Sequence, residues 1–267
     1  MQARDRRAAV IVWGALASAW PRAARAVDPY EIQVYDGTAN APGEAGVELH
    51  LNTVPSGRKD AEPPEVPMHQ QSHFTLEPSF GITRAWEIGA YLQTTLRRDG
   101  DFTYAGVKLR SKLVTPPEWH PNWRLGVNAE VSRLPEVYDR DRWGAELRPI
   151  AAWEDERWLL AANPILDLSL AGSGSGEGPS FEPAIMAKVK IENRVALGFE
   201  YYASLGPIAH PAPLSGQEHY LYETFDLLSI ERFELNAGIG EGLTAESNAL
   251  VVKVILGYGW DAMPKDR

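Results

Sequence analysis

The sequence predicts an all-β chain, an up-and-down antiparallel transmembrane β-barrel of about twelve strands. Apolar residues recur at every second position along much of the chain, which is the period of a strand with one apolar and one polar face. The connections between these runs alternate between short and long, and tryptophan residues gather at one end of the runs. Together these observations favour a barrel over a soluble β-sandwich.

The composition excludes several other classes of protein. The chain has 267 residues, no cysteine and a net charge of −10. These properties argue against a disulfide framework, Cys-ligated zinc and non-specific nucleic-acid binding. A run of about 18 consecutive apolar residues, the length that a membrane-spanning helix requires, does not occur in the sequence.

The first residues resemble a secretory signal peptide. Three arginines (Arg4, Arg6 and Arg7) precede an apolar run, and Ala24-Arg25-Ala26 supplies small residues for cleavage after Ala26. The alternative is a short amphipathic helix. We therefore predict an exported chain with four parts, which are a signal peptide at 1–26, a periplasmic N-terminal segment at 27–45, a barrel at 46–260 and a C-terminal tail at 261–267.

The strands follow from the alternation. In 123–132 every odd position is apolar and every even position is polar or glycine. Marking each such run gives predicted strands at 46–52, 73–80, 86–96, 102–113, 123–133, 143–153, 158–170, 181–190, 195–204, 219–228, 233–239 and 249–260. The tenth is the least regular, because Tyr220 and Tyr222 compete with Leu221 and Phe225 for the apolar face.

The lengths of the connections indicate which ends of the strands lie together. Tight turns are expected at 81–85, 154–157, 191–194 and 229–231, and long connections at 53–72, 135–142, 171–180 and 206–217. Two connections depart from the rule, a short one at 97–101 and a long one at 115–122. Outer-membrane barrels have this asymmetry, with short periplasmic turns and longer external loops.

Tryptophan positions give an independent indication, because indole rings favour the membrane–water interface. With this topology one rim, expected to be periplasmic, holds Trp86, Trp119, Trp123, Trp153, Trp158 and Trp260. At the opposite rim we expect Trp143 together with Phe102, Tyr104, Phe181 and Tyr220.

The polar face of each strand predicts a charged lumen. The candidate lumen-lining residues are Glu87, Lys108, Arg110, Lys112, Arg124, Glu130, Glu146, Arg148, Glu200 and Lys253. Folding adjacent strands together brings Glu87 near Arg110 and Lys112, and Glu130 near Glu146 and Arg148. Either these charges pair across a narrow lumen and plug it, or some of them line a selective path. Twelve strands are intermediate between filled and wide barrels, so we favour a narrow conduit or a partly plugged barrel.

The stretch Phe80-Gly81-Ile82-Thr83-Arg84-Ala85-Trp86-Glu87-Ile88-Gly89 resembles a strand–turn–strand hairpin of a bacterial family of outer-membrane transporters named after a meta-pathway phenol-degradation protein. The similarity extends loosely over about 47–260, with Arg84 where the family often has Asp. The resemblance implies an exported barrel that moves small hydrophobic compounds, and it transfers no functional residue.

Two further groups of residues suggest chemistry. His69 and His73, with Glu62 and Glu65 nearby, could bind copper or zinc, although this proline-rich span favours a solvated loop. Ser204 and His219 flank a long loop, as a hydrolase pair would, but their spacing shows no fixed geometry.

The sequence therefore predicts a protein of the bacterial outer membrane that passes a small, apolar or amphipathic solute. The alternatives are an outer-membrane lipid-modifying enzyme, a structural barrel with a plugged lumen and a soluble periplasmic β-protein. We expect no cofactor and no nucleic-acid partner. The expected partners are outer-membrane lipids and lipopolysaccharide, the small-molecule solute, and the barrel-assembly machinery that inserts such proteins.

Overall fold

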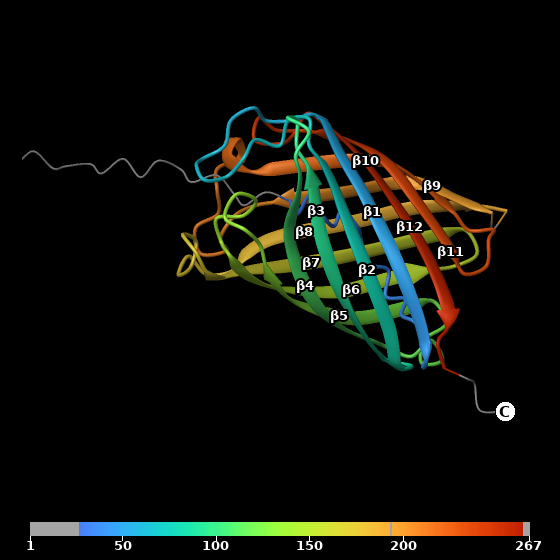
Figure 1. Cartoon of the computed structure of the whole chain (residues 1–267). Coiled ribbons are helices and arrows are strands. Elements are labelled where there is room, and N and C mark those ends of the chain that lie inside the picture. The colour runs from blue at the N-terminus through green and yellow to red at the C-terminus, as the bar shows by residue number, and fades with distance from the viewer. Residues whose placement is uncertain (1–26, 193, 264–267) are drawn as a thin grey trace, which may run out of the picture.

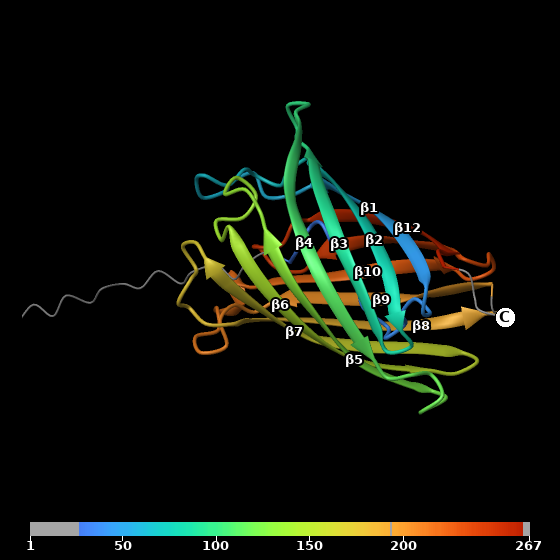
Figure 2. The same ribbon diagram turned by 60° about the horizontal axis from the view of Figure 1, so that its bottom comes forward.

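The computed structural model describes residues 27–192 and 194–263, so the predicted signal peptide and the end of the predicted tail lie outside the described residues. Within this part of the chain, twelve antiparallel strands form one closed barrel in which each strand pairs with its sequence neighbours and β1 pairs with β12 (Figures 1 and 2). The predicted fold class is confirmed. No helix among the described residues is long and apolar enough to span a membrane.

Every predicted strand is present, with bounds that differ from the prediction by a few residues. The strands are β1 (Glu44–Ser56), β2 (Ser72–Thr83), β3 (Trp86–Leu96), β4 (Phe102–Val114), β5 (Trp123–Arg133), β6 (Trp143–Glu154), β7 (Trp158–Ala171), β8 (Ser180–Ile191), β9 (Val195–Ser204), β10 (Glu218–Leu227), β11 (Phe233–Gly242) and β12 (Leu250–Asp261). One short 3₁₀ turn, η1 (Leu214–Gly216), lies before β10. We call the end of the barrel that carries the connections 57–71, 134–142, 172–179 and 205–217 the long-loop end, and the opposite end the short-turn end.

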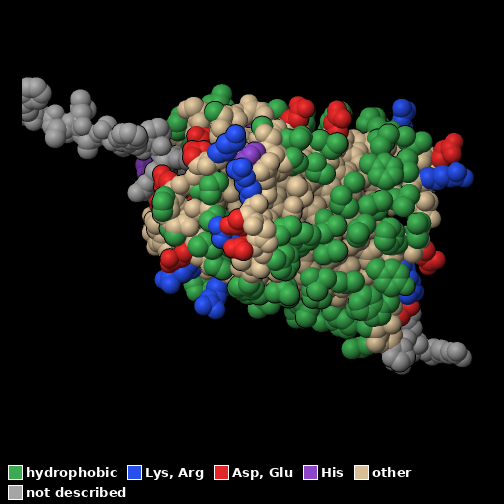
Figure 3. Space-filling model, turned by 45° about the horizontal axis from the view of Figure 1, so that its top comes forward, with side chains coloured by type: hydrophobic (Ala, Val, Ile, Leu, Met, Phe, Trp, Pro, Cys, Tyr) green, Lys and Arg blue, Asp and Glu red, His purple; other side chains and the backbone are tan. Residues whose placement is uncertain are grey.

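The outer wall of the barrel is apolar. Along β5 the side chains of Trp123, Leu125 and Val131 are exposed, whereas Asn128 and Glu130 between them are buried. Figure 3 shows hydrophobic side chains covering most of the visible wall, with most of the charged side chains toward the two ends. Because charged residues on a lipid-facing wall are costly, this arrangement is the one expected of a barrel surrounded by hydrocarbon.

Aromatic residues mark both rims, largely as predicted. Trp86, Trp123 and Trp158 begin their strands at the short-turn end and are all exposed. Tyr220 differs from the prediction, because it points into the barrel and is buried, as is Tyr222. These two rings pack beside that of Tyr202, with centroids 5.4 Å apart for Tyr202 and Tyr222, and Leu221 takes the outward position.

Residues 27–43, which belong to the N-terminal segment 27–45 that we predicted to be periplasmic, run through the inside of the barrel and reach its end at the exposed residues Ala41 and Pro42. Of these residues, Tyr30, Glu31, Ile32, Val34 and Tyr35 are buried. The segment pairs with no strand, and its polar groups find partners on the inner wall. We call residues 27–43 the lumen segment.

Candidate functional site

The lumen segment runs from one end of the barrel to the other. At the long-loop end the main-chain N–H of Val27 donates to Glu218, the first residue of β10, at 3.3 Å. At the short-turn end the N–H of Gly43 donates to the carbonyl of Gly81 at 2.9 Å, directly before β1 begins. The chain therefore passes through the whole interior before it enters the wall.

Side chains of the wall hold the main chain of the lumen segment at its centre. The amide of Asn163, on β7, accepts a hydrogen bond from the N–H of Tyr35 at 2.7 Å and donates one to its carbonyl at 3.0 Å. Lys253, on β12, donates to the carbonyl of Ile32 at 3.0 Å. The Tyr35 ring lies near two cations of the wall, and its centroid is 4.5 Å from the guanidinium of Arg148 and 5.2 Å from the ammonium of Lys112. These contacts fix the segment without making it a strand of the sheet.

The segment touches the wall closely at the short-turn end. Gly81, near the end of β2, has the carbonyl oxygens of Asn40 and Ala41 directly above it, and a Cβ built there would lie 2.4 and 2.2 Å from them. The N–H of Asn40 donates to a carboxylate oxygen of Glu87 at 2.6 Å. Only glycine leaves room for the chain at this point.

Charged side chains of the wall pair with the segment near the long-loop end. The carboxylate of Glu31 lies 3.3 Å from the ammonium of Lys108 and 3.1 Å from the guanidinium of Arg148. The two cations compensate the charge of this buried carboxylate. Lys108 also contacts Glu130, and Arg148 also contacts Glu146, at 3.3 and 2.7 Å. The predicted neighbourhood of Glu130, Glu146 and Arg148 is confirmed, because Glu130 and Glu146 are directly opposite each other in the β5–β6 register.

A second group of charges lies on β2, β3 and β4. Arg110 donates to Glu77 and to Glu87, both at 2.6 Å, and Lys112 lies 2.9 Å from Glu87. The predicted approach of Glu87 to Arg110 and Lys112 is confirmed, because Glu87 and Lys112 are directly opposite each other in the β3–β4 register.

A third group crosses the lumen. Glu200, on β9, contacts Lys188 at 2.9 Å and also pairs with Lys253, which belongs to a strand that does not neighbour β9. Arg124, near the short-turn end, contacts Asp36 of the lumen segment at 3.1 Å and Glu154 at 2.6 Å. All ten predicted lumen residues therefore lie on the inner face of the wall and have charged partners there, and their part in solute passage stays a prediction.

Two cavities lie on either side of the centre of the lumen segment. The larger, about 880 Å³, opens at the long-loop end and is lined by residues 28–30 of the segment and by the loops. The smaller, about 350 Å³, is lined by residues 33–38 and by the inner wall toward the short-turn end. Residues 31 and 32 line neither cavity. The lumen segment thus separates a long-loop cavity from a short-turn cavity.

The two other groups of residues that the sequence suggested, the Ser204–His219 pair and the histidines of the first long loop, do not come together in the structure. Ser204 points inward and donates to Glu182 at 3.3 Å, whereas His219, on the opposite face of the wall, contacts Tyr201 at 2.6 Å. The Ser204–His219 pair that a hydrolase would need is therefore absent, because adjacent positions of a register place side chains on alternate faces.

The histidines of the first long loop also separate. His69 accepts a hydrogen bond from the N–H of Gly57, whereas His73 is buried in the barrel and contacts Gln71. Glu62 pairs with Arg140 at the surface. His69 and His73 therefore do not meet at one copper or zinc site, which was the less favoured of the two interpretations of this loop, because the polypeptide enters β2 between them. A different group, which no motif in the sequence indicates, does lie together: Glu48 and His50 on β1 and Glu77 on β2.

A closed antiparallel barrel with an apolar wall and a charged interior defines a transmembrane β-barrel of the kind found in bacterial outer membranes, the location that the sequence predicts. No protein family and no curated protein matches the chain. Among solved structures, the chain is similar to the COG4313 outer membrane channel from Pseudomonas putida F1, with 13% identity and a TM-score of 0.61 over 86% of this chain and 100% of that chain.

The chain is also similar to the KdgM porin, with 6% identity and a TM-score of 0.53 over 80% of this chain and 98% of that one. At these identities the likeness shows the fold. The finer assignment, to the family named after the phenol-degradation protein, stays a prediction.

Proposed function

We propose that the protein is a narrow outer-membrane channel for small polar solutes, cations in particular, and that the lumen segment sets its constriction. The observation that carries this proposal is the pair of cavities on either side of a segment that is not part of the wall. An interior that served only as a core would be packed to the density of a protein interior, whereas these spaces far exceed the ~30 Å³ of a water molecule.

Charge supports the preference for cations. The long-loop cavity is lined by twelve acidic residues and by four lysines or arginines. A cleft with an excess of one sign concentrates ions of the opposite sign and sets the selectivity of a pore. The sequence favoured an apolar or amphipathic solute, and the resemblance implied hydrophobic compounds. The charged lining supports a polar solute instead, because an apolar one would leave these groups without water or a partner.

The proposal is tested by single-channel conductance in planar bilayers under a salt gradient. We expect a small conductance and a reversal potential that indicates cation selectivity. The combined variant Asp60→Asn, Glu62→Gln and Glu136→Gln removes three carboxylates of the long-loop cavity and should reduce that selectivity. The matched control is Glu118→Gln, Glu156→Gln and Glu231→Gln, which removes three exposed carboxylates at the short-turn end.

The control should leave the reversal potential nearer to that of the parent. Anion selectivity of the parent would contradict the preference for cations. If neither the parent nor a variant with a loosened lumen segment conducts ions, the proposed channel is contradicted. The protein would then be a structural barrel with a plugged lumen.

A further inference from the structure

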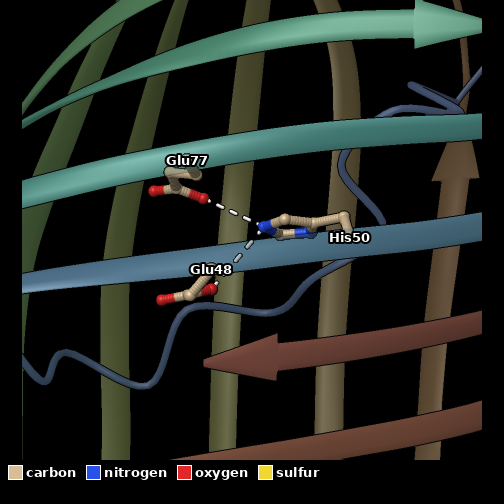
Figure 4. A group of neighbouring side chains, drawn as sticks. All are labelled: Glu48, His50 and Glu77. Atoms are coloured by element: carbon tan, nitrogen blue, oxygen red, sulfur yellow. Dashed lines mark hydrogen bonds and ion pairs between the residues drawn. The ribbon is translucent and has the colours of Figure 1, made fainter. Parts of the chain in front are cut away.

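We propose that Glu48, His50 and Glu77 form a binding site for one divalent transition-metal ion on the inner wall. Glu48 and His50 are two residues apart on β1, so both point into the barrel, and Glu77 faces them from β2 (Figure 4). Nε2 of His50 lies 3.0 Å from Oε2 of Glu77 and 3.6 Å from Oε2 of Glu48. One donor atom from each residue lies within 4.8 Å of the other two.

These separations match those of atoms that share one metal ion. Zinc binds carboxylate oxygen and imidazole nitrogen at about 2.0–2.2 Å, so two ligands at 90–110° lie roughly 3.0–3.5 Å apart. Both distances from His50 are close to that range. An imidazole nitrogen with two carboxylates suits zinc, iron, cobalt or manganese, whereas calcium and magnesium take oxygen ligands.

The strand register concentrates negative charge at this point. Glu48 and Glu77 are directly opposite each other in the β1–β2 ladder, where like charges destabilise the pair. On the other side of Glu48, the register continues through Gly257 to Glu234. A Cβ built on Gly257 would lie 3.3 Å from Cγ of Glu48 and 3.2 Å from a carboxylate oxygen of Glu234. Three carboxylates thus line one row across four strands.

Neighbouring cations balance only part of this charge. Arg110 binds Glu77 but shares its guanidinium with Glu87, and Lys112 also binds Glu87. A divalent ion between Glu48 and Glu77 would offset two of these three negative charges.

The surroundings of the site also favour a metal. Nε of Arg110 donates to Oε1 of Glu77 at 2.6 Å, which leaves Oε2 directed at His50. Such a contact orients a metal ligand through its second oxygen. His50 is fully buried, whereas Glu48 and Glu77 line the short-turn cavity, so an ion has a route to the site.

The site is coupled to the lumen segment. The side-chain amide of Gln33 donates to Oε2 of Glu48 at 3.3 Å, and this is the oxygen that faces His50. A metal ion would compete with Gln33 for this oxygen, so its binding would change a contact between the segment and the wall. The assignment of the metal site stands without the proposed channel, because it rests on the wall residues alone.

The test is metal titration of the folded full chain in detergent, by calorimetry with Zn²⁺ and by the visible absorption of Co²⁺. We expect one ion per chain in the parent and at least a tenfold loss of affinity in His50→Ala and in Glu48→Gln. The matched control is His73→Ala, which removes another buried histidine of the inner wall, whose imidazole contacts Gln71 and the ring of Tyr30. It should bind as the parent does.

The heat-dependent mobility of each variant on a detergent gel shows that its barrel is folded. If His50→Ala fails to fold, Glu48→Gln provides the comparison. Binding in the parent with only a millimolar Kd overturns the proposal. Equal binding by the parent and by the folded variants also overturns it, because the metal would then lie on surface histidines.

Discussion

Asn163 holds the main chain of Tyr35 by both of its side-chain polar atoms, accepting from the N–H at 2.7 Å and donating to the carbonyl at 3.0 Å. A strand would supply the same two partners from its own backbone. The side chain of Asn163 therefore makes the two main-chain hydrogen bonds that a neighbouring strand would otherwise make with Tyr35. A contact of this kind is removed by a single substitution, without any change to the hydrogen bonds of the barrel.

We expect Asn163→Ala to loosen the lumen segment and to increase single-channel conductance. Both polar groups of the Tyr35 peptide would lose their partner in a buried position, at a cost of about 1–3 kcal/mol each. The control is Asn128→Ala, because the amide of this buried residue on β5 donates to Glu130 at 2.7 Å and not to the segment. Equal conductance in the two variants would show that the segment does not restrict the pore.

We expect Gly81→Ala to displace the short-turn end of the lumen segment. The new methyl group would overlap the carbonyl oxygen of Ala41, and the strand behind it cannot yield without breaking its ladder. The chain has no cysteine, so Ala39→Cys gives a single thiol whose labelling rate reports the position of the segment. Labelling should be faster in the Gly81→Ala background.

The control for this substitution is Gly259→Ala at the same end of the barrel, on β12. A Cβ at Gly259 would be 3.4 Å from its nearest neighbour, which is an ordinary contact. Labelling should stay at the parent rate in this background. A similar acceleration in both backgrounds would indicate general loosening of the barrel and not displacement of the segment.

Acid should release the lumen segment through Glu31. Its carboxylate pairs with the cations Lys108 and Arg148, and protonation would remove both ion pairs. The docked segment therefore loses stabilisation as Glu31 is protonated on acidification. Conductance should rise as the pH falls.

In Glu31→Gln the charge is already absent, so conductance at neutral pH should exceed that of the parent and rise less on acidification. If the parent and the variant show the same pH profile, the rise of conductance in acid comes from other carboxyl groups of the lumen.

The barrel was predictable from the sequence because each strand is marked by a pattern of neighbouring residues. The alternation along 123–132 depends only on which residues face lipid and which face the lumen, and the two faces demand opposite polarity. The same pattern predicted the neighbours of Glu87 and Glu130, because consecutive strands of an up-and-down barrel are adjacent whatever the length of the connection. The alternation did not predict the orientation of Tyr220 and Tyr222, because an aromatic ring suits either face of the wall. In the structure both rings pack inside the lumen, beside Tyr202.

The lumen segment was not predictable in the same way. Its partners are distant in sequence, such as Asn163 for Tyr35 and Lys253 for Ile32, and no periodicity records such contacts. The apolar alternation of Tyr30, Ile32 and Val34 is the one local sign of an extended buried chain. Likewise, the approach of His50 to Glu77 depends on the register between β1 and β2, which the alternation alone does not fix.

Glu223 is a charge on the lipid-facing wall, and its replacement by leucine should stabilise the protein. It is exposed in the middle of β10, directly opposite Phe199 on one side and Ile239 on the other, and both of these apolar residues are more than half exposed. Because a carboxyl group in hydrocarbon is costly, Glu223→Leu should raise the free energy of unfolding by about 1–2 kcal/mol. The measurement is urea unfolding of the protein reconstituted in lipid vesicles.

The control is Glu241→Leu, which removes an exposed carboxylate of β11 nearer the long-loop rim, where the predicted gain is roughly 0–1 kcal/mol. If Glu223→Leu instead lowered the free energy of unfolding, this part of the wall would not face lipid. A protein partner or a second copy of the chain would then cover Glu223, since only a polar contact makes a carboxylate preferable to leucine there.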